Sequence, residues 1–169
     1  MKELVGERET IALENLKDLS KIFTGSFLTY GSCLAANREG KFIPWDTDTD
    51  MGIMSEEFDP SMVKKAEQAG FQVYKTFGTR EHGYEMALTR NGVKTDMWLF
   101  YTDDVIHNSL WGEHEIVHEY PLDMFKFEQH ALYGHSFKTF GEEYLTHVYG
   151  DWKTPKKEFN WKTDHICQK

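Results

Sequence analysis

Three aspartates, Asp46, Asp48 and Asp50, stand at every second position, and a fourth, Asp96, follows within a later apolar stretch. Alternate side chains of a β-strand point to one face, so an extended backbone would place the first three carboxylates side by side. Like charges this close repel and raise each other's pKa unless a cation neutralises them. Carboxylate oxygens suit Mg²⁺ or Mn²⁺, which also take ligands from phosphates. The spacing therefore predicts a divalent metal site built on a strand.

The dipeptide Gly31-Ser32 precedes the aspartates and is typical of a turn at the start of a helix. Backbone N–H groups and the helix dipole favour an anion there, and a serine hydroxyl adds a donor. Phosphoryl and nucleotidyl transfer need a positioned phosphate, neutralising cations and an oriented nucleophile. Together with the aspartates, this turn predicts phosphate-transfer chemistry. The alternative is that Asp46 and Asp48 belong to a polar loop and that Gly31-Ser32 is an ordinary turn.

Apolar periodicity and turn residues predict a mixed α/β fold, with a small mixed sheet that carries the aspartates and helices that flank it. Helices are expected at residues 8–23, 33–38 (capped by Ser32), 60–69 and 142–149. Strands are expected at residues 27–30, 46–54, 71–74, 85–90 and 93–99. The dipeptide Asn91-Gly92 predicts a hairpin turn. Residues 103–140 are assigned to short strands and turns.

Composition limits the classes of function. The chain has 169 residues, 40% of them hydrophobic, which suits one folded domain over residues 1–169. The formal charge of −9 argues against wrapping nucleic acid. A basic cluster near the C-terminus is interpreted as solvated surface; it comprises Lys153, Lys156, Lys157 and Lys162. No segment has the character of a signal peptide or a membrane span, so a cytoplasmic protein is expected.

Two cysteines, Cys33 and Cys167, lie at opposite ends of the chain and do not suggest a disulfide framework. Cys33 is expected to be a small buried residue, with a catalytic thiol as the alternative.

The run His114-Glu115-Ile116-Val117-His118 matches the HExxH motif of zinc metalloproteases, in which both histidines share a helix face. Isoleucine and valine favour a strand, and Pro121 follows closely. We therefore expect a strand with His114 and His118 as surface residues, and keep the zinc site as the alternative. The other histidines, including His130 and His135, are expected to be structural or surface groups.

Aromatic residues are abundant, and aromatic cages bind quaternary ammonium groups such as choline. Trp45 adjoins the aspartate segment and is the best candidate for such a cage. Ordinary packing is the alternative for each aromatic side chain.

The stretch from Gly31 to Gly52 resembles the core motif of the LicD family, which includes bacterial phosphocholine transferases and fukutin-related ribitol-phosphate transferases. Similar pieces follow in order, and the resemblance extends over about residues 25–156. These pieces lie at residues 95–100, 120–128 and 144–155. The resemblance implies the nucleotidyltransferase fold of the DNA polymerase β type.

The resemblance also implies a reaction, in which a phospho-alcohol such as phosphocholine passes from a CDP-linked donor to a glycan hydroxyl. Asp48 and Asp50 match the metal ligands, Asp46 an additional acidic position and Asp96 the third carboxylate. Gly31 and Ser32 would cradle phosphate, and Arg38 would brace it, because a guanidinium binds two oxygens.

Two other functions use the same residues. The first is transfer of a nucleotidyl group from an NTP to a small molecule or protein. The second is a catalytically silent domain that binds a nucleotide or a partner, which the intact Asp48, Asp50 and Asp96 argue against.

Overall fold

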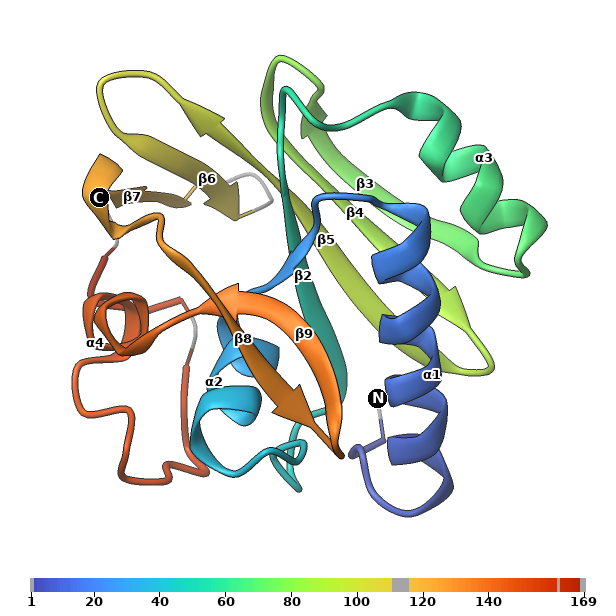
Figure 1. Cartoon of the computed structure of the whole chain (residues 1–169), viewed down its shortest axis with the longest axis horizontal. Helices are drawn as coiled ribbons and strands as arrows, with labels where there is room; N and C mark the ends of the chain where they lie inside the picture. The colour runs from blue at the N-terminus through green and yellow to red at the C-terminus, as the bar shows by residue number, and fades with distance from the viewer. Residues whose placement is uncertain (1, 111–115, 161, 168–169) are drawn as a thin grey trace.

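The computed structural model describes residues 2–110, 116–160 and 162–167, and Figure 1 shows how their helices and strands are arranged. The α-helices of this part are α1 (Glu7–Ile22), α2 (Tyr30–Arg38), α3 (Pro60–Gln68) and α4 (Glu142–Tyr149). The strands are β1 (Phe27–Leu28), β2 (Asp48–Met54), β3 (Gln72–Thr79), β4 (His82–Arg90), β5 (Val93–Thr102), β6 (Ile106–Leu110), β7 (Ile116–Tyr120), β8 (Phe127–Leu132) and β9 (His135–Phe140). A short 3₁₀ helix covers Leu122–Met124.

One mixed sheet joins these strands in the order β3-β4-β5-β2-β1-β9-β8, and β6 pairs with β5 and β7. The pairs β2–β5 and β1–β9 are parallel, and the remaining pairs are antiparallel. The predicted mixed α/β class is therefore confirmed. The sheet is larger than expected, because the segment between residues 106 and 140 supplies four more strands.

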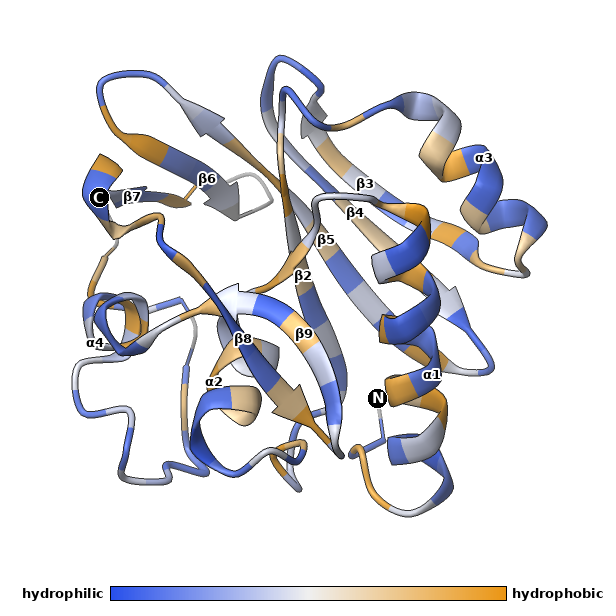
Figure 2. Ribbon diagram, viewed as in Figure 1, coloured by the Kyte–Doolittle hydropathy of each residue, from blue (hydrophilic) through white to orange (hydrophobic). Residues whose placement is uncertain are grey.

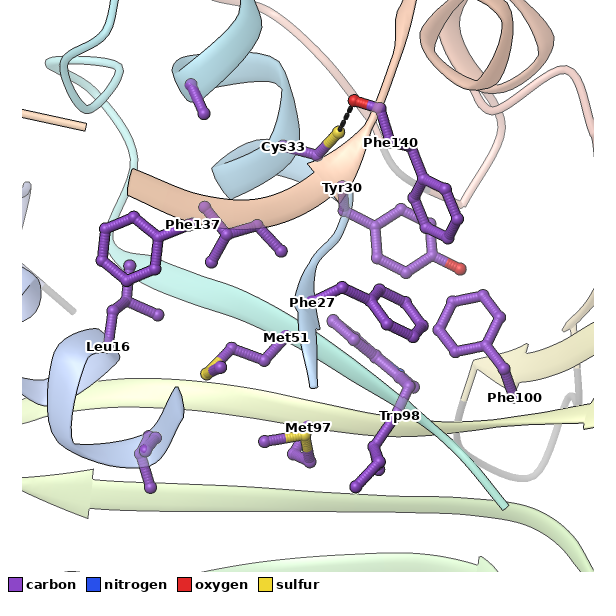
Figure 3. Close-up of a cluster of buried hydrophobic side chains, with 14 of the residues drawn as sticks. Leu16, Phe27, Tyr30, Cys33, Met51, Met97, Trp98, Phe100, Phe137 and Phe140 are labelled. Atoms are coloured by element: carbon purple, nitrogen blue, oxygen red, sulfur yellow. Dashed lines mark hydrogen bonds between the residues drawn. The ribbon is translucent and has the colours of Figure 1, made fainter. Parts of the chain in front are cut away.

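The central strands β2 and β5 have two different faces, because their side chains alternate. Met51 and Met97 are opposite each other in the β2–β5 register and are fully buried. Helix α1 packs against both strands, and Figure 3 draws its Leu16 in the same apolar cluster. Apolar and polar residues alternate along α1 and the strands in Figure 2. The other face of β2 is covered by α2.

An aromatic core closes the far end of the α2 face. The Phe27 ring lies 5.3 Å from that of Phe100 and 4.9 Å from that of Phe140. Gly52 lies directly beneath, and a Cβ there would be 2.5 Å from a ring carbon of Phe27 and 2.6 Å from one of Phe100. The glycine that follows the aspartates is therefore required by aromatic packing on the sheet.

Several predicted elements are confirmed. The helices expected at residues 8–23, 60–69 and 142–149 match α1, α3 and α4 within one residue at each end. Asn91 and Gly92 form the predicted hairpin turn, with φ values of 53° and 73°. Such positive φ values at both central residues are the geometry of a two-residue hairpin loop.

The start of α2 was predicted incorrectly. The helix begins at Tyr30 and not at Cys33, its N-cap is Thr29, and the strand expected at residues 27–30 is only Phe27–Leu28. The Tyr144 hydroxyl of α4 lies 2.5 Å from the Thr29 hydroxyl and accepts the Tyr30 N–H at 3.3 Å, so it holds the start of α2. Ser32 therefore lies inside the first turn and does not cap it.

Several strand boundaries also differ from the prediction, and β4 begins at His82 and β5 ends at Thr102, each three residues beyond the expected limit. Asp46 precedes β2, because its N–H donates to the Ile43 carbonyl in a turn and its carbonyl accepts from Leu4. The strand expected at residues 71–74 continues through Thr79, paired along its length with β4. Among the helices in the described residues, no segment is both long enough and apolar enough to cross a membrane.

Candidate active site

The parallel register of β2 and β5 brings the predicted acidic residues together. Asp50 is opposite Asp96, and Asp48 is opposite Lys94. Residues two apart on one strand share a face, so these four side chains lie on the α2 face. The strand geometry that the sequence predicted for Asp48 and Asp50 is present.

Lys94 lies between two of the carboxylates. Its ammonium nitrogen is 2.8 Å from Asp48 Oδ2 and 2.5 Å from Asp96 Oδ2. The side chains are 19% exposed for Lys94, 29% for Asp48 and 9% for Asp96. These ion pairs are shielded from water and are less screened than surface pairs.

Gly31 allows α2 to approach the acidic cluster. A Cβ at this position would lie 3.0 Å from Asp50 Oδ2 and 3.1 Å from Asp46 Oδ2. Any larger residue would crowd both carboxylates, so glycine is explained here by close packing. Asp46 lies outside the strand, but its carboxylate reaches the same place as that of Asp50.

Ser32 contacts the backbone beside the acidic cluster. Its hydroxyl accepts the Asp50 N–H at 2.8 Å, and the residue is buried. It is absent from the lining of the cavity described below. This contact fixes the start of β2 against α2, and phosphate binding by Ser32 stays a prediction.

Burial and mutual repulsion raise the pKa values of the carboxylates. The pKa of Asp46 rises to about 7 because of burial and the nearby Asp48, although Arg38 acts in the opposite direction. Burial, together with Asp48, Asp96 and Asp46, raises the pKa of Asp50 well above its ordinary value. Burial raises the pKa of Asp96 to about 6 in spite of Lys94. Burial and clustering therefore disfavour the ionised form of these carboxylates.

A cavity of about 540 Å³ opens above this cluster. The predicted site residues that line it are Gly31, Arg38, Trp45, Asp46, Asp48, Asp50 and Asp96. Residues that the sequence reasoning did not select also line it: Glu85, Lys94, Trp98, Tyr149, Trp152, Lys156, Lys157, Phe159 and His165. Except for Ser32, the predicted site residues therefore share one cavity.

Positively charged side chains also line the cavity. Arg38, at the end of α2, is held by Glu39 at 3.0 Å and donates to the Trp152 carbonyl at 3.4 Å. Lys156 and Lys157 are exposed, as predicted, but they also line the cavity and are not merely solvated surface. Acidic and basic groups therefore face one space, which is the arrangement that a metal-bound phosphate requires.

The donor set fits a hard divalent cation. Asp48, Asp50 and Asp96 would hold it, with Asp46 as the additional carboxylate. The Asp96 side chain is nine-tenths buried, and its Oδ1 lacks a hydrogen-bond partner among the described residues. In residues 2–110, 116–160 and 162–167 the acidic, histidine and cysteine side chains do not form a ready three-ligand centre. Lys94 lies between two of the predicted ligands, so metal binding requires these side chains to rearrange.

A neutral hydrogen-bond network lies next to the acidic cluster. Tyr30, the residue before Gly31, has its hydroxyl 2.8 Å from His118 Nδ1, 3.0 Å from Asn108 Oδ1 and 3.1 Å from the Tyr120 hydroxyl. These four residues are buried. Tyr30 has a φ of 41°, a strained conformation for a bulky residue. The network holds it in place.

The histidines of this region are uncharged. Burial, together with the neighbouring His165 and His147, lowers the pKa of His118 to about 3. Burial lowers the pKa of His165 to about 4, with Asp164 acting in the opposite direction. The two imidazole rings lie 5.0 Å apart, edge to face.

The HExxH motif does not form a helix over its described part. His114 and Glu115 lie outside the described residues, and His118 lies in β7. The strand was predicted, but the surface position of His118 was wrong, because its side chain packs under Tyr30. His130, half-buried beside Glu128 at 2.8 Å, and the exposed His135 agree with the structural or surface assignment.

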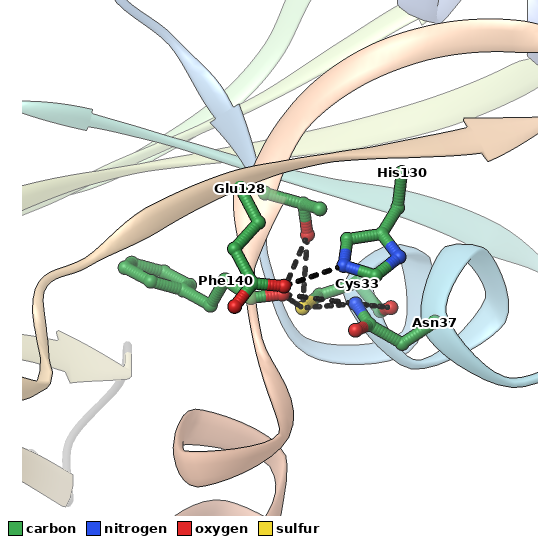
Figure 4. A network of polar contacts seen from close by, with 6 residues as sticks. Cys33, Asn37, Glu128, His130 and Phe140 are labelled. Carbon is green, nitrogen blue, oxygen red and sulfur yellow. Dashed lines mark hydrogen bonds and ion pairs between the residues drawn. The ribbon is translucent and has the colours of Figure 1, made fainter.

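Cys33 and Asn37 attach α2 to β9, as Figure 4 shows. The Asn37 amide donates to the Phe140 carbonyl at 2.9 Å, and the Thr139 hydroxyl donates to Cys33 Sγ at 3.0 Å. Burial raises the pKa of the Cys33 thiol to about 12. Cys33 is therefore the buried residue that was predicted. Both cysteines are free, as expected.

Comparisons with known proteins agree with this geometry. Residues 24–138 match the profile of the family described as LicD/FKTN/FKRP, nucleotidyltransferase domain. The Ribitol-5-phosphate transferase FKTN of Mus musculus is 27% identical over 162 residues, which cover 90% of this chain and 34% of that protein. Its Homo sapiens counterpart is 25% identical over 155 residues, which cover 86% of this chain and 33% of that protein.

A shorter match is the Ribitol 5-phosphate transferase FKRP of Mus musculus, 31% identical over 102 residues, which cover 56% of this chain and 21% of that protein. The chain therefore spans about a third or less of the length of these relatives. The four aspartates, Gly31, Ser32, Arg38 and Trp45 all lie within the matched profile. Because this profile covers more than half of the chain, the protein belongs to the LicD/FKTN/FKRP family.

Proposed function

We propose that this chain is a metal-dependent phosphotransferase domain, which moves a phosphorylated alcohol from a CDP-linked donor to a hydroxyl group of a glycan. The observation that carries the proposal is the shared cavity, which is lined both by Asp48, Asp50 and Asp96 and by basic side chains. Family membership and the names of the relatives, which are ribitol-5-phosphate transferases, support the same reaction class.

The proposed reaction breaks the pyrophosphate linkage of the donor. The acceptor hydroxyl oxygen attacks the phosphorus that carries the alcohol, a new P–O bond forms, and CMP leaves with the bridging oxygen. The hydroxyl proton passes to a base. The products are a glycan phosphodiester and CMP, so the step requires no oxidant or further reactant.

The carboxylates of the acidic cluster would hold the cation and activate the acceptor hydroxyl. A Mg²⁺ or Mn²⁺ ion bound by Asp48 and Asp50 would neutralise charge on the phosphate oxygens. Asp96 is the candidate base for the acceptor hydroxyl, because a pKa of about 6 leaves it mostly ionised at neutral pH and close to the working range.

The basic side chains would bind the donor phosphates. Arg38, Lys156 and Lys157 offer charged donors in the same cavity as the carboxylates. The backbone at Gly31 lies at the start of α2, where a helix favours an anion. In this arrangement the pyrophosphate lies between α2 and the metal, and the alcohol points toward the acceptor.

The transferred alcohol distinguishes two versions of the proposal. The relatives' names favour ribitol phosphate. The aromatic lining, which includes the half-buried Trp45, instead suits a choline-like cation. If choline is bound, Trp45→Ala should weaken CDP-choline binding by roughly 1–2 kcal/mol, the scale of a partly desolvated cation–π contact. CDP alone should lose much less; equal losses would assign Trp45 to packing or base stacking.

The deciding experiment compares donors by thermal shift and by product analysis. CDP-ribitol, CDP-choline, CTP and ATP are each added with Mg²⁺ or Mn²⁺, and CMP release is followed with a glycan acceptor. We expect one CDP-alcohol to raise the melting temperature and to yield CMP, and EDTA to abolish both effects. Strong stabilisation by an NTP, with pyrophosphate release and inert CDP-alcohols, would replace this proposal with nucleotidyl transfer. Nucleotide binding without turnover of any donor would indicate a silent domain.

A further inference from the structure

Lys94 has no role in the reaction outlined above, yet it occupies the centre of the acidic cluster. It starts the acidic face of β5, opposite Asp48 in the register and two residues before Asp96. One ammonium group therefore bridges carboxylates from two strands, at 2.8 Å and 2.5 Å. Burial lowers the pKa of Lys94, but Asp96 and Asp48 together raise it above its ordinary value. The bridge therefore stays charged.

The bridge uses the oxygens that a metal would need. Mg²⁺ binds carboxylate oxygens at about 2.0–2.1 Å. An ion bound to Asp48 Oδ2 and Asp96 Oδ2 would take the two oxygens that the Lys94 ammonium now pairs with. Like charge disfavours both cations on the same two oxygens.

A single ammonium compensates the cluster incompletely. Asp96 Oδ1 is buried and lacks a hydrogen-bond partner in the part of the chain that the structure describes. Asp50 and Asp46 approach Gly31 with their carboxylates and are not among the ion-pair partners of Lys94. A divalent ion brings twice the charge and can bind several carboxylates, so it can displace the lysine at sufficient concentration.

The displaced side chain has a partner available nearby. Lys94 already lines the cavity that faces Arg38 and Lys156. The anions that this cavity is proposed to take are the phosphates of a nucleoside diphosphate. A lysine ammonium is a flexible point charge well suited to a phosphate oxygen.

We propose that Lys94 exchanges partners during the binding cycle: it competes with the divalent metal for Asp48 and Asp96, and after displacement it binds a phosphate of the donor. Lys94 thereby weakens metal binding in the absence of nucleotide and strengthens nucleotide binding in the presence of metal. This inference rests on the metal and the nucleoside diphosphate of the proposed function.

The test is a pair of equilibrium titrations on the whole chain and on Lys94→Met, which keeps an unbranched side chain one atom shorter and removes its charge. Mn²⁺ is titrated alone and followed by electron paramagnetic resonance; CDP is then titrated at saturating Mn²⁺ by calorimetry. Because a competing charge has been removed, Lys94→Met should bind Mn²⁺ at least about tenfold more tightly. Because a phosphate contact has been removed, it should bind CDP about tenfold more weakly.

Two further variants separate this exchange from a general charge or folding effect. Lys64→Met removes an exposed charge from α3, outside the cavity, and should leave Mn²⁺ affinity within about twofold, because solvent screens that charge. Lys94→Arg keeps a competing charge and should bind Mn²⁺ close to the wild-type affinity. Circular dichroism confirms that each variant is folded before titration.

Unchanged or weaker Mn²⁺ binding by folded Lys94→Met would overturn the exchange and leave the proposed function standing. Tighter Mn²⁺ binding with unchanged CDP affinity would overturn the phosphate contact. If none of the proteins bound Mn²⁺, both the exchange and the metal-dependent function would fail. The titrations do not depend on turnover, so failure to find an active CDP-alcohol would leave their result intact.

Discussion

Two adjacent residues, Tyr30 and Gly31, place α2 against two very different buried polar regions. On one side, the Tyr30 hydroxyl joins Asn108, His118 and Tyr120 in a neutral network. On the other side, Gly31 leaves space for the carboxylates of Asp46 and Asp50. The first region buries neutral polar groups and hydrogen-bonds most of them, although His118 Nε2 lacks a partner among the described residues. The second hides charges that Lys94 compensates only in part.

The difference indicates which region serves structure and which serves chemistry. A buried neutral group that is hydrogen-bonded costs little, whereas clustered buried charges are costly unless a partner neutralises them. The raised pKa values of Asp46 and Asp96 show that their cluster retains this cost. Strongly perturbed groups that line a cavity are typical of functional sites, and because Tyr30 and His165 also line this cavity, the clustered charge is what distinguishes the acidic region. We therefore expect variants of the two regions to affect different properties.

The largest effect is expected from Asp50→Asn, which keeps the shape of the side chain and removes its charge. Transfer activity and Mn²⁺ binding should fall by at least about a thousandfold, because a metal ligand is lost. The melting temperature without metal should stay equal or rise, because repulsion with Asp48 is relieved. Activity assays and thermal melts measure the two effects.

An aspartate outside the cavity provides the control for Asp50→Asn. The exposed Asp123 lies in the short 3₁₀ helix, and Asp123→Asn should change neither activity nor metal binding. Wild-type turnover by Asp50→Asn would contradict the assignment of the acidic cluster as the reaction site.

The neutral region should respond in the opposite way. Tyr30→Phe removes the hydroxyl shared by Asn108, His118 and Tyr120, and should lower the free energy of unfolding by about 1–3 kcal/mol, the cost of leaving buried polar groups without a partner. Metal affinity should change little. Urea denaturation and Mn²⁺ titration test these expectations, and Tyr74→Phe, at a site 72% exposed, serves as the neutral control. Unchanged stability of Tyr30→Phe would mean that the network is not structural.

The acidic region could be predicted from the sequence, because its information is local. Alternation along one strand placed Asp48 and Asp50 on one face, and the apolar flanks of Asp96 indicated a neighbouring strand. Lys94 lies on the same face as Asp96. It was not predicted as a site residue, because a lysine is not a ligand for Mg²⁺ or Mn²⁺. Asp46 was assigned to the strand because spacing alone does not show where pairing begins.

The neutral region depends on pairing between distant segments. Tyr30 meets Asn108 and His118 only because β6 and β7 pair with each other and pack near α2. The sequence pattern around His118 does not indicate this pairing or the contact with Tyr30, so His118 was wrongly expected on the surface. Lys156 and Lys157 were likewise placed at the cavity by a segment without regular secondary structure, in which no periodicity indicates direction.

The contributions of the two regions to folding stability should also change with pH in opposite directions. The pKa values of His118 and His165 are about 3 and 4 in the folded protein, below the ordinary 6.5. Between these values the unfolded state binds more protons, so the stability that they contribute is present above pH 6.5 and is lost as pH falls toward 4. Asp46 and Asp96 have pKa values of about 7 and 6, above the ordinary 3.8. Between about pH 4 and 7 these two carboxyl groups bind more protons in the folded state than in the unfolded state. Their contribution to stability therefore falls as pH rises from about 4 to 7.

Denaturation curves of variants between pH 4.5 and 8 separate the two contributions. Asp96→Asn should remove part of the loss at higher pH, and His118→Asn part of the loss at lower pH, each by roughly 1–2 kcal/mol across its range. If Asp96→Asn reduced the loss of stability at low pH, or His118→Asn the loss at high pH, the assigned pKa shifts of these two regions would be contradicted.

The smallest effect concerns Ser32, which lies beneath the acidic region but makes a neutral hydrogen bond. Ser32→Ala removes the acceptor of the Asp50 N–H and should cost about 1 kcal/mol of unfolding free energy. Ser26 offers a matched control, because its buried hydroxyl has no hydrogen-bond partner among the described residues, and Ser26→Ala should be nearly neutral.

If Ser32 positions the strand, Ser32→Ala should slightly lower the affinity for both CDP and Mn²⁺, because the acidic cluster is held less firmly. If its hydroxyl instead binds phosphate, CDP affinity alone should fall, without loss of stability. Calorimetric titration beside urea denaturation therefore decides whether Ser32 belongs with the structural hydrogen bonds or with the charged groups that bind substrate.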